Sequence, residues 1–427
     1  SAICRERADW LVGINATRYF TVKNGNKGVI SIGRVQTPTL AMIVERDSEI
    51  KNFKKSYYYT VEIKCGDIIA ESNRFESEEA AKIACDNSHL GGVTNIENES
   101  KAENPPKLYD LTSLQRDANR MLGFTAQQTL DILQKLYEAK LVTYPRTDSR
   151  YLTEDMENTA LSVIEAITSA MDFKINVQPD IKPVMNNAGV SDHYAIIPTV
   201  NIKTTNLSVL DDNSVKLLYL ISSRLLSATA PKYEYESTKV TILCNHDTPD
   251  PNGYTYTAKG KTVTNRGFKE IEKQLAKLIN GKYDEKYDTE LPKTHVGAMY
   301  LCDSKVIKHE TQPPKPYTED TLLSAMEKAG SKDYTSNDVE RKGLGTPATR
   351  ANIIETLIKR GYVERRGKQL ISTDKGANVV YSVPEVLRSA KMTAEWENEL
   401  SQIAKGKAES KAFIKNTENF VKSILTM

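Results

Sequence analysis

The stretch TPATRANIIETLIKRGYVERRGKQLIS, residues 346–372, contains a complete helix signal followed by a hairpin signal. Thr346 is a favoured N-cap residue, and Pro347 suits the first helical position. Gly361 follows the last turn of apolar residues and suits the left-handed conformation that ends many helices. The alternating side chains on either side of Gly367 predict two short antiparallel strands. The stretch therefore predicts one helix that leads directly into a hairpin.

The chain contains this pattern twice. PPKPYTEDTLLSAMEKA, which begins at Pro313, supplies a preceding helix, and PPKLYDLTSLQRDANRM, which begins at Pro105, resembles it. The second helix of the earlier copy has a capping-box pair, Thr125 and Gln128. The second helices have matching apolar faces, formed by Leu130, Leu133, Leu136 and Tyr137 in one copy and by Ile353, Ile354, Leu357 and Ile358 in the other. Two helices followed by a wing are the outline of a winged-helix domain, a common nucleic-acid reader.

Tyr144 differs from its counterpart in the other copy. Aligned through the second helices, Tyr144 falls opposite Arg365. The fold therefore does not require a tyrosine at this position. Pro145 restricts Tyr144 to an extended conformation, which we expect at the end of a strand. One alternative remains open, because most of the 21 tyrosines will simply pack with the hydroxyl group at the surface.

Arg146 and Asp148 follow Tyr144 in the segment YPRTDS. A phenol has a pKa near 10, so it needs nearby positive charge or a base to act as a nucleophile. Arg146 can supply that charge and can hold a phosphate through paired hydrogen bonds. Asp148 could orient Arg146 or cap the helix expected near Thr153. These residue types indicate attack on a phosphate group.

Three further stretches are candidate phosphate contacts. SIGRVQTP (31–38) and GLGTPATR (343–350) are glycine-containing turns ahead of helices, where free N–H groups favour anions. SDHYAIIPT (191–199) places His193 immediately before an apolar run. The turns could equally be ordinary capped helix starts, and His193 could be a satisfied core or loop histidine rather than a phosphate contact or proton donor.

Length and charge limit the possible protein classes. At 427 residues the chain predicts two to four domains, and a net charge of +2 means that any polyanion site must be a local patch. Residues 341–368 contain such a patch, with eight Lys or Arg against two Glu. There is no apolar run long enough for a membrane span, and the first residues do not resemble a signal peptide. Because the chain lacks an initial methionine, we expect a piece of a longer protein.

Cysteine usage indicates the redox compartment. Five scattered cysteines without a Cys-x-x-Cys pair favour a reducing cytosol and argue against a disulfide framework or a zinc site.

Residues 1–50 predict two helices, the second with Thr37 as N-cap and Pro38 as its first residue. The β-periodic stretches are 57–72, 232–268 and 291–307, with helical sequence over 108–230 between them. We expect a β domain built from two segments with a helical domain inserted between them.

Seven stretches in order resemble the type IA DNA topoisomerases, and among these the bacterial topoisomerase III group. They are RADWLVGINATR, SIGRVQTPTLAMIVERDSEI, YPRTDS, HYAIIPT, HETQPPKPYTEDTLLSAME, GLGTPATRANIIETLIKRGYV and MTAEWENELSQIAKG. The resemblance implies a toroidal, multidomain α+β core with winged-helix-like domains. It implies an isomerase that cleaves one DNA strand without ATP, passes another strand through the gap and reseals the first one.

The resemblance also implies roles for individual residues. Tyr144 would form a 5′-phosphotyrosine, Arg146 would hold the scissile phosphate with support from Asp148, and His193 would contact the phosphate. Two further groups would bind single-stranded DNA. The first comprises Arg7, Asp9, Ser31, Ile32, Gly33, Arg34, Val35 and Gln36, and the second comprises Thr318, Thr349 and Arg350.

The resemblance implies a Mg²⁺ site that the chain itself does not supply. Family members carry an N-terminal Toprim domain whose Asp-x-Asp-x-Glu cluster binds magnesium, and this chain contains no such motif. We therefore expect no metal ligands here, with the Toprim domain acting in cis in the full-length parent. Alone, the chain is expected to bind single-stranded DNA with little or no catalysis.

By the same resemblance, the chain divides into three domains. A DNA-gripping domain would comprise 1–55 and 312–427, a β arch would comprise 56–107 and 232–311, and a helical domain with Tyr144 would comprise 108–231. Further candidate partners are a helicase or a single-strand-binding protein, in the cytoplasm at the nucleoid. The main alternative is a non-enzymatic single-stranded-DNA or winged-helix binding module. A tyrosine recombinase is disfavoured because Tyr144 precedes His193.

Overall fold

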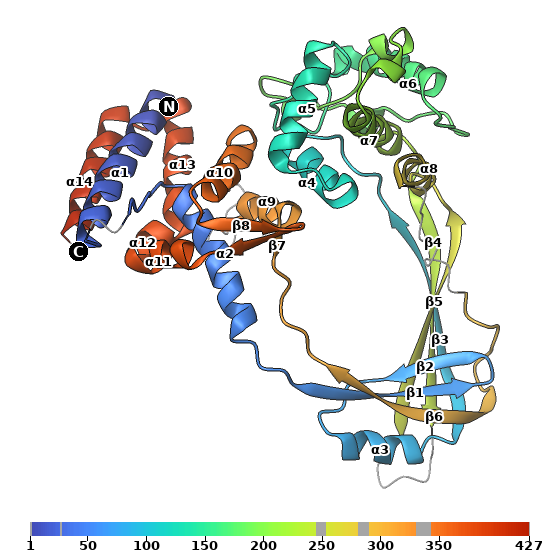
Figure 1. Cartoon of the computed structure of the whole chain (residues 1–427). Helices are drawn as coiled ribbons and strands as arrows, with labels where there is room; N and C mark the ends of the chain where they lie inside the picture. The colour runs from blue at the N-terminus through green and yellow to red at the C-terminus, as the bar shows by residue number, and fades with distance from the viewer. Residues whose placement is uncertain (1, 26–27, 245–252, 281–289, 330–342, 427) are drawn as a thin grey trace.

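The computed structural model describes residues 2–25, 28–244, 253–280, 290–329 and 343–426. These residues form three bodies arranged as a ring: a helical body made from both ends of the chain, a second helical body, and a β barrel (Figure 1). Each body has its own cluster of buried apolar side chains.

The terminal helical body brings the two ends of the chain together, with α1 lying beside α14 (Figure 1). Its core includes Leu40, Leu323 and Leu357, each about 1% exposed or less. Its helices are α1 (Ala2–Lys23), α2 (Gln36–Lys51), α9 (Glu319–Lys328), α10 (Pro347–Lys359), α11 (Asp374–Ser382), α12 (Glu385–Arg388), α13 (Ala390–Ala404) and α14 (Ser410–Leu425). Its sheet has the order β7-β9-β8, formed by β7 (Tyr317–Thr318), β8 (Val363–Arg366) and β9 (Gln369–Ser372).

This body confirms the helix and the hairpin predicted for residues 346–372. Thr346 is the N-cap of α10, Pro347 is its first residue, and Gly361 adopts φ 71° directly after the helix. Strands β8 and β9 pair around Gly367, which has φ 62°. Only glycine enters this region of φ without steric cost, which explains both turns.

The second helical body is built from the earlier copy and the helices that follow it. Its helices are α4 (Leu111–Leu122), α5 (Ala126–Glu138), α6 (Glu157–Ala170), α7 (Asp212–Ala228) and α8 (Lys269–Asn280). Short 3₁₀ turns occur at Glu154–Met156, Lys182–Val184, Asn187–Gly189, Val200–Lys203 and Leu207–Val209. The Thr125–Gln128 capping box is confirmed, and Leu133 is fully buried. Tyr137, predicted to share that apolar face, is instead exposed.

The β barrel is closed, with strand order β1-β2-β5-β4-β3-β6, so strands from two distant segments form one sheet as expected. Its elements are β1 (Tyr57–Cys65), β2 (Ile68–Ser72), α3 (Glu78–Asp86), β3 (Leu90–Glu103), β4 (Tyr233–Cys244), β5 (Tyr254–Asn265) and β6 (Met299–Glu310). Val61, Ile63 and Ile242 fill the interior. Strands β3, β4 and β5 continue from the barrel to the second helical body (Figure 1).

Polar contacts join α9 of the terminal body to α4 and α5 of the second helical body. Arg116 pairs with Asp320 at 2.9 Å, and the carboxylate of Glu319 accepts a hydrogen bond from the backbone N–H of Ala126 at 2.5 Å. Where the chain passes between the terminal body and the barrel, the Ser56 N–H donates to the Thr311 hydroxyl, and the Thr311 N–H donates to the Ser56 carbonyl. The contact between the terminal body and the second helical body therefore includes hydrogen bonds and ion pairs, and Ala126 of α5 also packs in the apolar core of the terminal body.

Several local predictions were wrong. Helix α2 begins at Gln36, and the Thr37 hydroxyl accepts a bond from the N–H of Gly33 at 3.1 Å, so Thr37 is not the N-cap. The sequence assigned no helix to the β segments, yet α3 packs on the barrel and α8 packs its apolar side into the second helical body. Strand β6 begins at Met299, later than the expected 291.

The cysteine prediction also needs correction. Cys65 and Cys302 form a disulfide that joins β1 to β6. The antiparallel register places these two residues directly opposite each other, with Cα atoms 4.5 Å apart. Sequence spacing could not indicate this pairing because the two cysteines are 237 positions apart.

Candidate DNA-cleavage site and strand-binding groove

Tyr144 lies in an irregular segment after α5, not at the end of a strand as predicted. A single bridge between Val142 and Pro198 replaces the expected strand. The Thr143 N–H donates to the carbonyl of Ile197 at 3.0 Å. The Thr147 hydroxyl donates to the carbonyl of His193 at 2.9 Å. These bonds hold the Tyr144 segment alongside the His193 segment.

Tyr144 and His193 are consequently neighbours. Their ring centroids are 4.1 Å apart at an interplanar angle of 35°, and Tyr137 meets Tyr144 edge-on with centroids 5.6 Å apart. Tyr144 is half-buried in a hollow of about 600 Å³. The hollow is lined by Tyr137, Glu138, Lys140, Val142, Thr143, Tyr144, His193, Tyr194, Thr199 and Asn201. Tyr137 and Lys140 were not predicted as lining residues, although both lie within seven positions of Tyr144.

Arg146 and Asp148 are exposed just beyond this hollow. Over the described ranges, no ion pair joins Asp148 to Arg146. Asp148 does not cap the following turn either, because that N-cap is Thr153. The predicted orienting and capping roles of Asp148 are therefore absent in this conformation. The guanidinium of Arg146 faces solvent.

Lys140 has an unusual backbone conformation at the edge of the hollow. Its φ is +60°, in the left-handed region that side chains other than glycine enter at a cost of about 1–2 kcal/mol. Its carbonyl accepts hydrogen bonds from the Thr199 hydroxyl at 2.6 Å and from the Asn201 amide at 3.0 Å. When the two copies of the repeat are aligned, its counterpart is Gly361, which has φ +71°. The strained lysine therefore occupies a position that the other copy gives to glycine.

The turn at 31–36 is mostly packed inside the terminal body. Ser31, Ile32 and Arg34 are buried, and Gly33, Val35 and Gln36 are half-buried. The Arg34 guanidinium pairs with Asp9 at 2.7 Å and with Glu397 at 2.9 Å. Arg34 thus does not face solvent as a phosphate-binding side chain, whereas Arg7 on α1 is exposed.

A cationic groove of about 710 Å³ lies beside this turn. Its lining comprises Gly13, Ile14, Thr17, Arg18, Val29, Ser31, Ile32, Lys359, Arg360, Tyr362 and Lys375. The Arg360 guanidinium donates hydrogen bonds to the Ser31 hydroxyl and to the Gln36 side-chain carbonyl, the latter at 2.9 Å. Lys359, Arg360 and Lys375 were not singled out from the sequence, but the excess of basic residues over 341–368 includes the first two.

The second group of residues predicted to bind single-stranded DNA, Thr318, Thr349 and Arg350, makes structural contacts. Thr318 caps α9, and Thr349 forms the capping box of α10 with Thr346. Arg350 is buried, which lowers the pKa of its guanidinium. Its side chain donates to the Leu344 carbonyl at 3.1 Å and to the Thr112 hydroxyl at 2.9 Å. Arg350 therefore ties α10 to α4 and is not exposed to DNA in this conformation, contrary to the expectation.

Metal-binding clusters and membrane spans are both absent from the described ranges. No group of three or more His, Cys, Asp and Glu side chains is arranged to hold a metal ion there. None of the helices described is long and apolar enough to cross a bilayer.

A ring of two helical bodies and a barrel, with a tyrosine hollow on one body and a cationic groove on another, defines the toroidal topoisomerase fold. The full-length topoisomerase I of Thermotoga maritima has this fold, with a TM-score of 0.70 and 23% identity over 93% of this chain and 64% of its own. A family model described as DNA topoisomerase matches residues 1–415. The chain belongs to the type IA DNA topoisomerase family.

Curated relatives support the same assignment. DNA topoisomerase 3 of Bacillus licheniformis is 40% identical over 449 aligned residues, which cover 100% of this chain and 60% of that protein. DNA topoisomerase 3 of Bacillus subtilis is 38% identical, covering 98% of this chain and 59% of that protein. The chain thus spans about 60% of the length of the curated relatives it matches.

Proposed function

We propose that this chain carries the cleaving tyrosine and a single-strand groove of an ATP-independent DNA topoisomerase. The observation that supports this most directly is Tyr144, half-buried in an open hollow with its ring against that of His193. Tyr109 and Tyr256, by contrast, are fully buried in the core, where a DNA phosphate could not reach the hydroxyl group.

The proposed reaction is a transesterification. The Tyr144 Oη attacks a backbone phosphorus of single-stranded DNA, and the bond from that phosphorus to the 3′ oxygen breaks. The phenol loses its proton, and the departing 3′ oxygen gains one. The products are a 5′-phosphotyrosine and a free 3′-hydroxyl. Because the ester retains the energy of the broken bond, the reverse attack reseals the strand without ATP.

Arg146 and His193 are proposed to bind the reacting phosphate. The exposed guanidinium of Arg146 can hold two phosphate oxygens at once. The imidazole of His193 is exposed beside the phenol and can donate a hydrogen bond to a third oxygen as charge develops. Asp148 is proposed as a support for Arg146 that becomes engaged only when DNA is bound.

The cationic groove is proposed to bind the uncleaved part of the strand. Arg18, Lys359, Arg360 and Lys375 supply positive charge along it, with Ser31 at its base. Arg7 and Asp9 on α1, together with the 31–36 turn, extend this surface. Arg34 acts through the turn, because its ion pairs with Asp9 and Glu397 hold the segment in place.

Strand passage requires the ring to open. We propose the domain assignment given above: a gripping domain (1–55 and 312–427), an arch (56–107 and 232–311) and a helical domain (108–231). The hydrogen bonds and ion pairs that join α9 to α4 and α5 suit a reversible opening, because water can replace them when the bodies separate and they can form again. The arch strands would bend while DNA remains attached to Tyr144.

The family implies magnesium, but the described residues do not fit a magnesium site. They contain no cluster of three or more carboxylate, histidine or cysteine side chains that could hold a metal. We propose that the ligands of this metal lie outside this chain. The chain alone is then expected to bind single-stranded DNA and to cleave it poorly. In the cell it would work at the nucleoid, with a helicase or a single-strand-binding protein as candidate partners.

Binding and cleavage by the chain can be tested together. Fluorescence anisotropy with a labelled single-stranded oligonucleotide should show binding that weakens steeply with salt, and a duplex of the same sequence should bind more weakly. Denaturing electrophoresis of the same mixture should show little covalent adduct. Equal affinity for duplex and single strand would contradict the proposed substrate and favour a general winged-helix binding module.

A further inference from the structure

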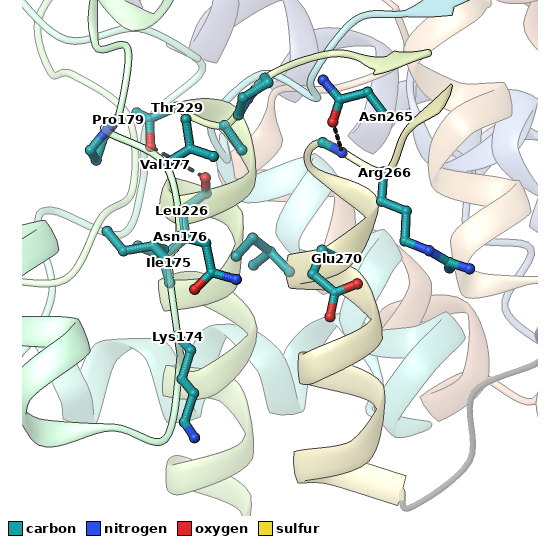
Figure 2. Close-up of a pocket in the computed structure, with 14 residues that line it drawn as sticks. Lys174, Ile175, Asn176, Val177, Pro179, Leu226, Thr229, Asn265, Arg266 and Glu270 are labelled. Atoms are coloured by element: carbon teal, nitrogen blue, oxygen red, sulfur yellow. Dashed lines mark hydrogen bonds between the residues drawn. The ribbon is translucent and has the colours of Figure 1, made fainter. Parts of the chain in front are cut away.

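A pocket of about 200 Å³ lies where the second helical body meets the arch, with no lining residue in common with the Tyr144 hollow or the cationic groove. Three segments surround it: residues 174–179, the end of α7 with the two residues that lead to Pro231, and the turn from Asn265 into α8 (Figure 2). Its walls are mostly apolar, with Ile175, Leu226 and Ile271 among them. None of these residues has a role in the proposed cleavage reaction.

The pocket sits at the root of the arch. Strand β4 begins at Tyr233 and β5 ends at Asn265, so both strands leave the helical body beside it. The N–H of Phe268 donates to the Pro231 carbonyl at 2.9 Å. Gly267, at φ +46°, approaches so closely that a Cβ there would collide with the Lys232 carbonyl oxygen. The joint between the two strands is therefore closely packed.

The segment 174–179 is held in place near both of its ends. The backbone N–H of Lys174 donates to the side chain of Gln274 at 2.8 Å, and that side chain donates back to the Lys174 carbonyl at 3.0 Å. The N–H of Asp180 donates to the Thr229 carbonyl at 2.8 Å. The concavity is thus fixed by hydrogen bonds on three sides and is largely preformed.

The size and lining of the pocket indicate what it can hold. A cavity of about 150 Å³ lined by Leu, Ile and Phe side chains stays dry and binds benzene. A pocket of about 200 Å³ accepts one aromatic ring with a short side arm. Burial of such a ring between Leu226 and Ile271 would be driven by the hydrophobic effect.

The charge at the opening indicates the polar group of the ligand. The Glu270 carboxylate and the Asn176 amide face the space between α7 and α8, whereas the ends of Lys174 and Arg266 extend away from it (Figure 2). Both groups at the opening can accept a hydrogen bond from an ammonium group, and a carboxylate favours a cationic donor.

We propose that this pocket binds a small aromatic amine, with its ring between Leu226 and Ile271 and its ammonium group on Glu270. A bound molecule bridges the end of α7 and the start of α8, and so fixes the angle at which the arch leaves the helical body. A bound molecule should therefore slow strand passage, and this consequence rests on the proposed function. Binding itself does not.

The test uses the chain without DNA, and its probe is 2-phenylethylamine. Saturating probe should slow amide hydrogen exchange at least threefold at Phe268 and Asp180, whose bonds span the pocket, and leave Ile63 in the barrel unchanged. 2-Phenylethanol, which lacks the charge, should bind at least fivefold more weakly, and ethylamine, which lacks the ring, should have no effect. Absence of saturable protection by 2-phenylethylamine, or equal binding of the amine and the alcohol, would overturn the proposal.

Matched variants locate the site. Ala230→Phe fills the pocket and should abolish protection, and Glu270→Gln should remove the preference for the amine over the alcohol. Val209→Phe adds the same kind of side chain at a site 74% exposed in the same body and should behave as the parent chain. If Ala230→Phe does not fold, Ala230→Leu takes its place as the pocket-filling variant. Loss of protection in Ala230→Leu, together with loss of the amine preference in Glu270→Gln, then locates the site. Full protection in a folded pocket-filling variant would place the ligand elsewhere and refute the assignment.

Discussion

The imidazole ring of His193 lies 4.1 Å, centroid to centroid, from the phenol ring of Tyr144. The two residues are 49 positions apart in the sequence, and the bonds from Thr143 and Thr147 to the 193–197 segment bring them together. This contact makes the first prediction specific. His193→Phe keeps a ring against Tyr144 and removes both ring nitrogens. We expect adduct formation by a cleavage-competent protein to fall roughly 10²-fold, the cost of removing one donor to a developing oxyanion.

The measurement for His193 is the rate of covalent adduct formation with a labelled single strand, alongside binding affinity. Affinity should change little, because the groove supplies most of the charge. An unchanged cleavage rate in His193→Phe would show that the histidine serves only to pack against Tyr144.

Arg360 is expected to contribute directly to strand binding. It lines the cationic groove and reaches both Ser31 and Gln36. Arg360→Ala should weaken single-strand affinity and reduce the slope of log K against log salt by about 0.7, the value for one phosphate contact on a single strand. Lys82→Ala, on α3 of the barrel, is the control and should leave the slope unchanged. If both variants shift the slope equally, the groove is not the binding surface.

Lys140 provides a stability test. Lys140→Gly should raise the free energy of unfolding by about 1 kcal/mol, because glycine adopts φ +60° without steric cost. The reciprocal change, Gly361→Lys, should lower it by a similar amount, since a Cβ at Gly361 would meet no atom within 4 Å and only the backbone strain is added. Urea denaturation measures both. A loss of stability in Lys140→Gly would mean that the lysine side chain stabilises the fold by more than its backbone costs.

Glu397 should give the terminal body a defined acid sensitivity. Burial would raise the pKa of this carboxyl, but hydrogen bonds from Arg5 and the charge of Arg34 hold it below its usual value. A depressed folded-state pKa stabilises the protein above the unfolded-state pKa of about 4.3, and this contribution is lost as pH falls through the folded value. Glu397→Gln should cost roughly 1.5–3 kcal/mol at pH 7 and less at pH 3. A cost that does not depend on pH, measured by urea denaturation at both values, would exclude the charge as its cause.

The sequence was most informative where local signals agree with packing. The helix-and-hairpin pattern around 346–372 and the capping box at Thr125 were both correct, because each depends on residues within one or two turns. Helix α8 was not predicted because it follows strand β5 in a stretch of β-periodic sequence. Its apolar face packs into the second helical body, most of whose residues come before β4. Its burial is a tertiary property that periodicity around the strands does not reveal.

The candidate site shows the same division between local and long-range information. Tyr144 and His193 were both singled out as candidates from the sequence, but their contact depends on hydrogen bonds between distant segments. Arg34 and Arg350 were predicted as DNA-binding residues in turns ahead of helices, whereas the structure buries each of them against partners far along the chain. Of the basic side chains that line the groove, Lys375 lies on α11, a helix that no sequence motif singled out.

The central claim is that the oxygen of Tyr144 becomes esterified to DNA. The direct measurement uses this chain joined to the part of the Bacillus licheniformis relative that it does not cover, incubated with Mg²⁺ and a 5′- or 3′-labelled single strand and then denatured. Peptide mapping by mass spectrometry should locate the nucleotide on Tyr144, the label should show attachment through a 5′ phosphate, and Tyr144→Phe should give no adduct while still binding the strand. An adduct on any other residue, or one that persists in Tyr144→Phe, would contradict the account.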